Sequence, residues 1–160
     1  MHHRGWLAAA VIAVVIILVV AFGVTRANIS ALPEPGAFES SIATKVKDWY
    51  ISRAARNRLP PAPAKDAASV AAGGALFGMD CASCHGQDGR TPAPIGKWMY
   101  PRVLNLGSPA VQRMSDRELF WVIKNGIRLS GMPGFAHINN DEEIWQLTYY
   151  VRNLGAQAKQ

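Results

Sequence analysis

Cysteine is scarce in this chain, and so are clustered charges outside its N-terminal part. The 160 residues include two cysteines, and they contain no internal repeat or long low-complexity segment. Residues 66–160 carry nine Lys or Arg against eight Asp or Glu, so this part is nearly neutral. Nucleic-acid binding needs a basic patch on a folded module, and none is apparent. The excess of positive charge lies in residues 1–65 and points to membrane phospholipid as the acidic partner.

An uncharged apolar run near the N-terminus predicts a transmembrane helix. Leu7 to Val24 contains no charged residue and, as a helix, would be about 27 Å long, which nearly spans a bilayer core. The run is longer than the roughly 7–15 residues of a signal-peptide core. We therefore expect residues 1–26 to be a retained single-pass anchor. A cleaved secretory signal ending near Thr25-Arg26-Ala27 is the alternative, and under both interpretations the remainder of the chain is exported.

A second helix is expected in the segment 27–65 that follows. Apolar residues recur there at helical spacing within residues 37–59, and they are Phe38, Ile42, Val46, Trp49 and Tyr50. This amphipathic helix has three possible positions: on lipid headgroups, on a partner subunit, or against the rest of the chain. The sequence from Leu59 to Ala64 contains three prolines, so it predicts a stiff linker at the end of the segment.

The two cysteines form a motif with the histidine that follows them, Cys81-Ala82-Ser83-Cys84-His85. This C-x-x-C-H spacing is the attachment signature of c-type haem, because two thiols three positions apart can reach both vinyl groups on one porphyrin edge. The histidine then lies over the ring, where its imidazole can bind the iron. Other interpretations are a surface dithiol, a zinc half-site or a thioredoxin-like pair. Zinc needs two more good ligands, and a thioredoxin-like pair needs a βαβ context that the flanking sequence lacks.

Helix signals on both sides of this motif predict an all-α domain over residues 66–160. Apolar periodicity and flanking residues place its main helices at about 67–78, 115–125 and 141–154. Their boundary signals are an N-cap at Asp66, a capping box of Ser115 with Glu118, and a stop at Gly155.

The packing of the first and last helices is expected to depend on glycine. Gly73 and Gly74 each cost about 1 kcal/mol relative to alanine inside a helix. A glycine that costs stability in this way permits another backbone to approach closely. We therefore expect the last helix to cross the first at Gly73, with Phe77 beside Leu147 and Tyr150.

The sixth iron ligand is expected in the loop between the middle and last helices. Met132 lies in Ser130-Gly131-Met132-Pro133-Gly134-Phe135, where glycines let the backbone approach a flat macrocycle and proline stiffens the loop. Of the five methionines, Met132 has the most suitable setting, and Met99 in the preceding long loop is also possible. His137 is the rival and would give a bis-histidine iron, and an open sixth position is the third possibility.

The segment from Arg90 to Leu106 contains three prolines and is expected to be a loop on the histidine side of the haem. Within it, Pro94 is a candidate to offer its carbonyl to His85 and so fix the imidazole. Trp98, Tyr100 and Arg102 are candidates to reach the haem propionates. Alternatively, the two aromatic residues only cover the haem edge.

Residues 66–160 resemble a class I monohaem cytochrome c domain. The resemblance rests on Gly73-x-x-x-Phe77, Cys81–His85, the Gly126 turn, Gly131-Met132-Pro133 and Trp145-x-Leu147-x-x-Tyr150. It implies one covalent haem c per chain, an iron held by His85 and Met132, and a role in electron transfer. The part from Asn125 to Arg152 is especially similar to haem c domains of bacterial respiratory membrane complexes. The sequence before Pro60 has no counterpart in soluble cytochromes c.

These features favour an electron carrier over an enzyme, because a six-coordinate iron has no open position for a small-molecule substrate. We expect a membrane-anchored monohaem cytochrome, all-α, that transfers single electrons on the outer, periplasmic face of the cytoplasmic membrane. The expected partners are a quinol-oxidising complex, a terminal oxidase or another cytochrome of a respiratory or photosynthetic chain. The alternative is a ligand sensor or a peroxidase-like enzyme with an open sixth position, although a peroxidase usually has a second haem.

Overall fold

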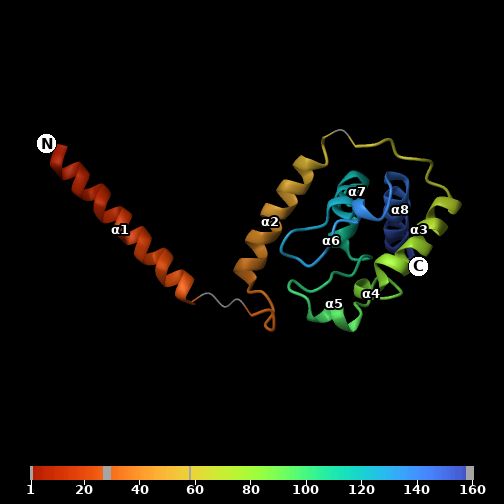
Figure 1. The fold of residues 1–160 in the computed structure, drawn as a ribbon, viewed down its shortest axis with the longest axis horizontal. Helices are drawn as coiled ribbons and strands as arrows, with labels where there is room; N and C mark the ends of the chain where they lie inside the picture. The colour runs from red at the N-terminus through yellow and green to blue at the C-terminus, as the bar shows by residue number, and fades with distance from the viewer. Residues whose placement is uncertain (1, 27–29, 58, 158–160) are drawn as a thin grey trace. The chain divides into compact units, whose positions relative to one another are not determined.

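The computed structural model describes residues 2–26, 30–57 and 59–157. All the secondary-structure elements in these ranges are helices (Figure 1). The all-α prediction is confirmed. The chain divides after Ser30 into two compact units. The first contains α1 (His2–Arg26). The second contains α2 (Ala37–Ala54), α3 (Ala67–Asp80), α4 (Ala82–His85), α5 (Pro94–Trp98), α6 (Pro109–Gln112), α7 (Asp116–Asn125), the 3-10 turn η1 (Phe135–His137) and α8 (Asp141–Gln157).

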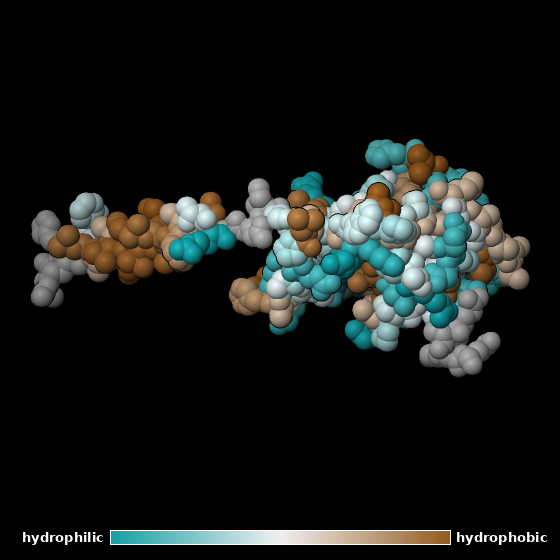
Figure 2. Space-filling model, turned by 90° about the horizontal axis from the view of Figure 1, so that it is seen from below, coloured by the Kyte–Doolittle hydropathy of each residue, from teal (hydrophilic) through white to brown (hydrophobic). Residues whose placement is uncertain are grey.

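Helix α1 is apolar along most of its length. Its stretch Gly5–Arg26 is 22 residues long, which corresponds to about 33 Å and is enough to cross a membrane. None of this stretch is buried. Figure 2 shows most of its visible surface in brown, the colour of hydrophobic residues. A helix of this kind near the N-terminus is compatible with a membrane anchor and with a signal sequence.

Helices α3 and α8 cross at Gly73, as the sequence predicts. A Cβ atom added to Gly73 would lie 2.0 Å from the carbonyl oxygen of Gln146, so the two backbones touch there. Next to this point, the rings of Phe77 and Tyr150 lie 5.0 Å apart between centroids, and Leu147 belongs to the same buried cluster. The crossing therefore requires a residue without a side chain at position 73, and the packing of Phe77 on Tyr150 stabilises it.

The core of the second unit joins α3, α7 and α8. Phe77, Phe120, Ile144 and Leu147 are at most 1% exposed, and burial of each such side chain contributes about 1.5–3 kcal/mol. The ring of Phe120 lies 4.4 Å from that of Trp145, which links α7 to α8. These three helices form the support on which the loops of the site are held (Figure 1).

The boundaries of these helices follow local capping chemistry with one exception. Asp66 accepts a hydrogen bond from the Ser69 N–H at 2.7 Å, and Ser115 forms the predicted capping box with Glu118. The predicted stop at Gly155 is wrong, because α8 continues to Gln157. An added Cβ at Gly155 would lie 2.3 Å from Cδ of Gln112, so this glycine makes room for a neighbouring side chain instead of ending the helix.

Two short helices lie between α4 and α7, and the first of them, α5, is within the segment 90–106 that was expected to be loop. Both α5 and α6 begin with a proline, at Pro94 and Pro109, and each follows a residue with extended backbone. Proline is favourable at the first position of a helix, since its fixed φ is already helical and its missing N–H would have no partner there. One of the three prolines that indicated a loop, Pro94, therefore starts a short turn of helix.

Helix α2 packs against α7 of the same unit. Ile51 is 3% exposed, and the rings of Tyr50 and Trp121 meet edge to face with centroids 5.7 Å apart. Arg117 on α7 donates to the carbonyls of Ala55 and Asn57 at 3.0 and 2.8 Å, just beyond the C-terminal end of α2. Of the three positions open to this helix, the structure shows contact with the rest of the chain, while its opposite face stays exposed.

The proline-rich segment after α2 lies along α8. The hydroxyl of Tyr149 donates to the Pro63 carbonyl at 2.8 Å, and the Lys65 ammonium lies 5.6 Å from the centre of the same ring. Leu59 packs on the buried core. The segment is extended, as three prolines require, but it is bound to the domain rather than separated from it.

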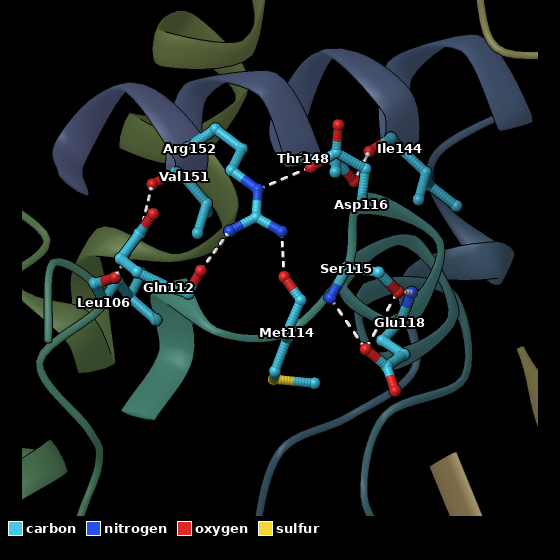
Figure 3. A network of polar contacts seen from close by, with 10 residues as sticks. All are labelled: Leu106, Gln112, Met114, Ser115, Asp116, Glu118, Ile144, Thr148, Val151 and Arg152. Carbon is cyan, nitrogen blue, oxygen red and sulfur yellow. Dashed lines mark hydrogen bonds and ion pairs between the residues drawn. The ribbon is translucent and has the colours of Figure 1, made fainter. Parts of the chain in front are cut away.

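Arg152 on α8 ties down the segment between α6 and α7 (Figure 3). Its guanidinium donates to the Asp116 carboxylate at 2.5 Å, to the Gln112 carbonyl at 2.7 Å, and to the Met114 carbonyl. The Gln112 amide donates in turn to the carbonyls of Leu106 and Val151 at 2.8 and 2.9 Å. One arginine and one glutamine thus satisfy five backbone or side-chain acceptors and fix this segment on α8.

Candidate haem-binding site

The C-x-x-C-H motif lies at the junction of α3 and α4. Cys81 stands between the two helices, and its carbonyl accepts hydrogen bonds from the N–H groups of Cys84 and His85 at 3.1 and 2.9 Å. Both thiols are free and half-buried. Cys81 is three positions before Cys84 and four before His85, so on a helical turn each of these two side chains lies next to that of Cys81.

Burial shifts the pKa values of two side chains of this turn, Cys81 and His85. It raises the pKa of the Cys81 thiol to about 12, with a smaller contribution from the Asp80 carboxylate, so that thiol is neutral at pH 7. Burial also lowers the pKa of His85, and the Leu104 carbonyl only partly opposes this shift. The neutral imidazole is the form that binds a metal ion, so the environment of His85 favours the ligating state.

The His85 ring is oriented by a backbone carbonyl. Nδ1 lies 3.3 Å from the carbonyl oxygen of Leu104, and a proton on Nδ1 leaves Nε2 as the electron-pair donor. The sequence interpretation gave this role to Pro94, and the structure differs. Pro94 is the exposed first residue of α5, where its carbonyl points along the helix, and the contact is made by Leu104, in the loop after α5.

Gly96 holds the loop against the motif. An added Cβ there would lie 2.2 Å from the Cys84 carbonyl oxygen, so the loop backbone touches the attachment turn. The Cys84 carbonyl accepts from the Ala93 N–H, and the Gly96 carbonyl accepts from the Val103 N–H, both at 3.1 Å. The sequence interpretation did not single out Gly96. Its signal would have been a glycine inside a helical turn, where it is unfavourable unless a close contact requires it.

Met132 lies on a tight loop that folds back on itself between α7 and η1. The Ile127 N–H donates to the Met132 carbonyl at 3.2 Å, and the Ser130 hydroxyl donates to the Ile127 carbonyl at 2.7 Å. Gly126 and Gly131 both have φ of 70°, a conformation that glycine adopts without strain. Met132 is half-buried and packs on the same apolar cluster as Cys81, so the structure brings the two predicted residues to one region.

The rivals of Met132 have different surroundings. His137, in η1, is exposed. Met99 is half-buried, and its Cε would lie 2.5 Å from a Cβ added to Gly131, which places a second thioether beside the Met132 loop. The neighbourhood therefore favours methionine over histidine as the second axial ligand.

The three propionate candidates make other contacts in the structure. The Tyr100 hydroxyl donates to the Glu39 carboxylate at 2.5 Å, and Arg102 forms an ion pair with Glu34 at 2.8 Å. Trp98 is 76% exposed. Residues 31–35 line a cavity of about 80 Å³ together with residues 97–100 and Arg102. These contacts attach the first turn of α2 and the segment before it to the haem-side loop, and a role at the propionates stays a prediction.

The donor set suits haem c better than a bare metal ion. Among the side chains that the structure describes, in residues 5–26, 30–57 and 59–156, no group of three or more His, Cys, Asp or Glu is placed to hold a metal ion. Two thiols and an imidazole on one turn instead provide two attachment points and one axial ligand. Apolar side chains are exposed around this turn, as expected beside a large apolar ring; they are Ile95, Trp98 and Leu104. The residues present therefore fit a haem.

Comparison with protein families agrees with this donor set. Residues 68–151 match the family described as cytochrome c oxidase, cbb3-type, subunit III. The chain belongs to this family of cytochrome c domains. Membership implies covalent haem c and a domain that is typically an electron carrier outside the cytoplasm. The sequence-based assignment to cytochrome c is thereby confirmed.

Comparison with solved structures supports the fold of this cytochrome c domain. A chain of the Kuenenia stuttgartiensis reducing HAO-like protein complex Kustc0457/Kustc0458 superposes with a TM-score of 0.54 at 22% sequence identity. The match covers 62% of this chain and 52% of that chain, so this cytochrome spans about half of its relative. Comparison with curated proteins gives no match.

Proposed function

We propose that this cytochrome is a membrane-anchored monohaem electron carrier, with the haem attached through Cys81 and Cys84 and its iron ligated by His85 and Met132. The observation that carries the proposal is the attachment turn itself. Both thiols and the imidazole belong to the single turn from Cys81 to His85, while the Leu104 carbonyl lies 3.3 Å from Nδ1 and leaves Nε2 for the iron.

Each residue has a separate task in this proposal. The haem supplies reversible one-electron chemistry at its iron. Cys81 and Cys84 prevent loss of the haem, and His85 sets its position relative to α3. Met132 would supply the second iron ligand, and its tight loop would hold the thioether in place. A closed position excludes oxygen, peroxide and small substrates, so these residues support electron transfer rather than catalysis.

The proposed location is the outer, periplasmic face of the cytoplasmic membrane, with α1 retained as a single-pass anchor. Two observations support this location: the cytochrome c family is extracytoplasmic, and α1 is long and apolar enough to cross a membrane. The proposed partners are redox proteins of a respiratory or photosynthetic chain: a quinol-oxidising complex, a terminal oxidase or another cytochrome. Consistent co-purification with such subunits in mild detergent would indicate a fixed subunit, and purification alone would indicate a shuttle.

The decisive experiment is a visible spectrum of the membrane-extracted protein, reduced minus oxidised, for the wild type and for Met132→Ala. We expect covalent low-spin haem in the wild type and loss of the sixth ligand in the variant. Met79→Ala is the matched control, because Met79 is two residues before the motif and 71% exposed; its spectrum should equal that of the wild type. Met99→Ala tests the neighbouring thioether.

Two results would overturn this assignment. A high-spin wild type that binds carbon monoxide when reduced would mean an open iron, and a ligand sensor or peroxidase-like enzyme would then be the better proposal. Low-spin haem in Met132→Ala that is lost in Met99→Ala would transfer the ligand role to Met99.

A further inference from the structure

Helix α2 carries a second apolar face that packing against α7 does not use. Phe38, Ile42, Val46 and Trp49 are 80%, 47%, 60% and 64% exposed, and they recur at spacings of four, four and three. At 3.6 residues per turn they form one stripe on the side opposite Ile51, which is 3% exposed. A helix at the surface of a domain normally presents polar residues on this side.

The charges around this stripe are positive. Lys45 and Arg53 fall on the same side of the helix and are exposed. The acidic residues of α2 are both engaged elsewhere: Asp48 pairs with Lys47 at 2.6 Å, and Glu39 accepts from Tyr100. The stripe therefore combines apolar side chains with cations that have no acidic neighbour on that face, a composition that complements anionic lipid headgroups.

The position of α2 in the chain keeps it close to a membrane. Residues 27–36 alone separate it from α1, and ten extended residues span at most about 35 Å. With α1 across the bilayer, α2 cannot move far from the surface. Trp49, the last residue of the exposed stripe, is of a type enriched at the membrane–water interface.

We propose that the outer face of α2 lies on the anionic phospholipid surface of the membrane that α1 spans. This inference rests on the proposed retention of α1 as an anchor. The stripe inserts at headgroup level, while Lys45 and Arg53 contact lipid phosphates. The opposite face stays bound to α7, so α2 is held between the lipid surface and the cytochrome c domain.

The test uses the full-length, haem-loaded protein in vesicles and measures how deep α2 lies. Both native cysteines are consumed by the proposed thioether bonds, so a cysteine introduced at Ile42→Cys or Val46→Cys takes a spin label selectively. Thr44→Cys is the matched control on another side of the same helix, where the residue is also exposed. Collision of the label with oxygen, which partitions into lipid, is compared with collision with a water-soluble nickel complex.

In vesicles that contain phosphatidylglycerol, we expect labels at 42 and 46 to shift toward high oxygen and low nickel accessibility. The label at 44 should remain accessible to nickel. The shift should be smaller in pure phosphatidylcholine, and Lys45→Glu with Arg53→Glu should abolish the difference between the two lipids. Labels at 42 and 46 that stay as accessible to nickel as the control would overturn the proposal. So would shielding that appears only when membrane proteins of the host are added, which would assign the face to a protein partner.

The same samples separate this inference from the proposed function. Loss of the protein from the vesicles in an alkaline carbonate wash would show that α1 is not an anchor, and an abnormal haem spectrum would refute the electron-carrier assignment. A retained protein with a normal spectrum and aqueous labels would refute only the docking of α2.

Discussion

Gly73 of α3 lies against the backbone carbonyl of Gln146 in α8, with no room for a side chain between them. A Cβ atom would be 2.0 Å from that oxygen, and the contact sits at the crossing that supports the attachment turn. Gly73→Ala should therefore separate the helices and lower the free energy of unfolding by about 1–3 kcal/mol, as overpacked cores do. Thermal or denaturant unfolding followed by circular dichroism measures this loss.

Gly78 provides the control for this substitution. It is in the same helix and is exposed, and no atom lies within 4 Å of its added Cβ. Gly78→Ala should stabilise the protein by about 0.5–1 kcal/mol, because alanine is the better helix former. Equal effects of the two substitutions would mean that helix propensity, and not the crossing, determines the cost at position 73.

Gly96 should be needed for haem attachment more than for overall stability. Gly96→Ala would place a methyl group 2.2 Å from the Cys84 carbonyl and push the loop away from the attachment turn. We expect little covalent haem in this variant, measured as haem-stained protein on a denaturing gel, and normal attachment in Gly78→Ala. Full haem content in Gly96→Ala would contradict the close contact between α5 and the motif.

Arg152 should be one of the costliest polar residues to replace. Arg152→Met leaves the carbonyls of Gln112 and Met114 and the Asp116 carboxylate without their donor, which should lower the free energy of unfolding by about 2–4 kcal/mol. Arg152→Lys keeps the charge but loses the planar set of donors, so it should lie between this variant and the wild type. Arg113→Met, at an exposed neighbouring position, should change stability little.

The turn after His85 should respond to acid through Asp88. The Asp88 carboxylate accepts from the N–H groups of Arg90 and Thr91, both at 2.8 Å, and these bonds hold its pKa below the usual value of 3.8. Since the folded-state pKa is the lower one, the carboxylate stabilises the fold above the unfolded-state pKa, and this contribution disappears as the pH falls through the folded-state value. The wild type should thus be more stable than Asp88→Asn at pH 6, and the difference should narrow toward pH 3. A difference that is independent of pH would contradict this role.

The features that local patterns predict well are those that depend on neighbouring residues. Asp66 and Ser115 start helices because their side chains reach N–H groups three positions away, and the sequence alone predicts both. The motif at Cys81–His85 is equally local. Gly73 was predictable because a glycine in a helix signals a close approach.

The features that the sequence did not reveal depend on how distant segments meet. The carbonyl that contacts His85 belongs to Leu104, and any residue type supplies the same carbonyl, so no side-chain pattern marks it. A glycine such as Gly155 often follows the end of a helix, but here the helix continues through it and the Gln112 side chain fills the space beside it. The placement of a loop or a side chain against another element is set by tertiary packing, which local propensity does not encode.

The bond from Tyr149 to Pro63 has a consequence for how far the haem can travel. As a random coil, residues 37–65 would have a root-mean-square length of about 30 Å. Helix α2 and the proline-rich segment are instead bound to the domain, so they add nothing to the distance over which the haem can move. If α1 is the anchor proposed above, a partner fixed in the same membrane therefore stays at a higher local concentration than it would with a flexible tether of that length.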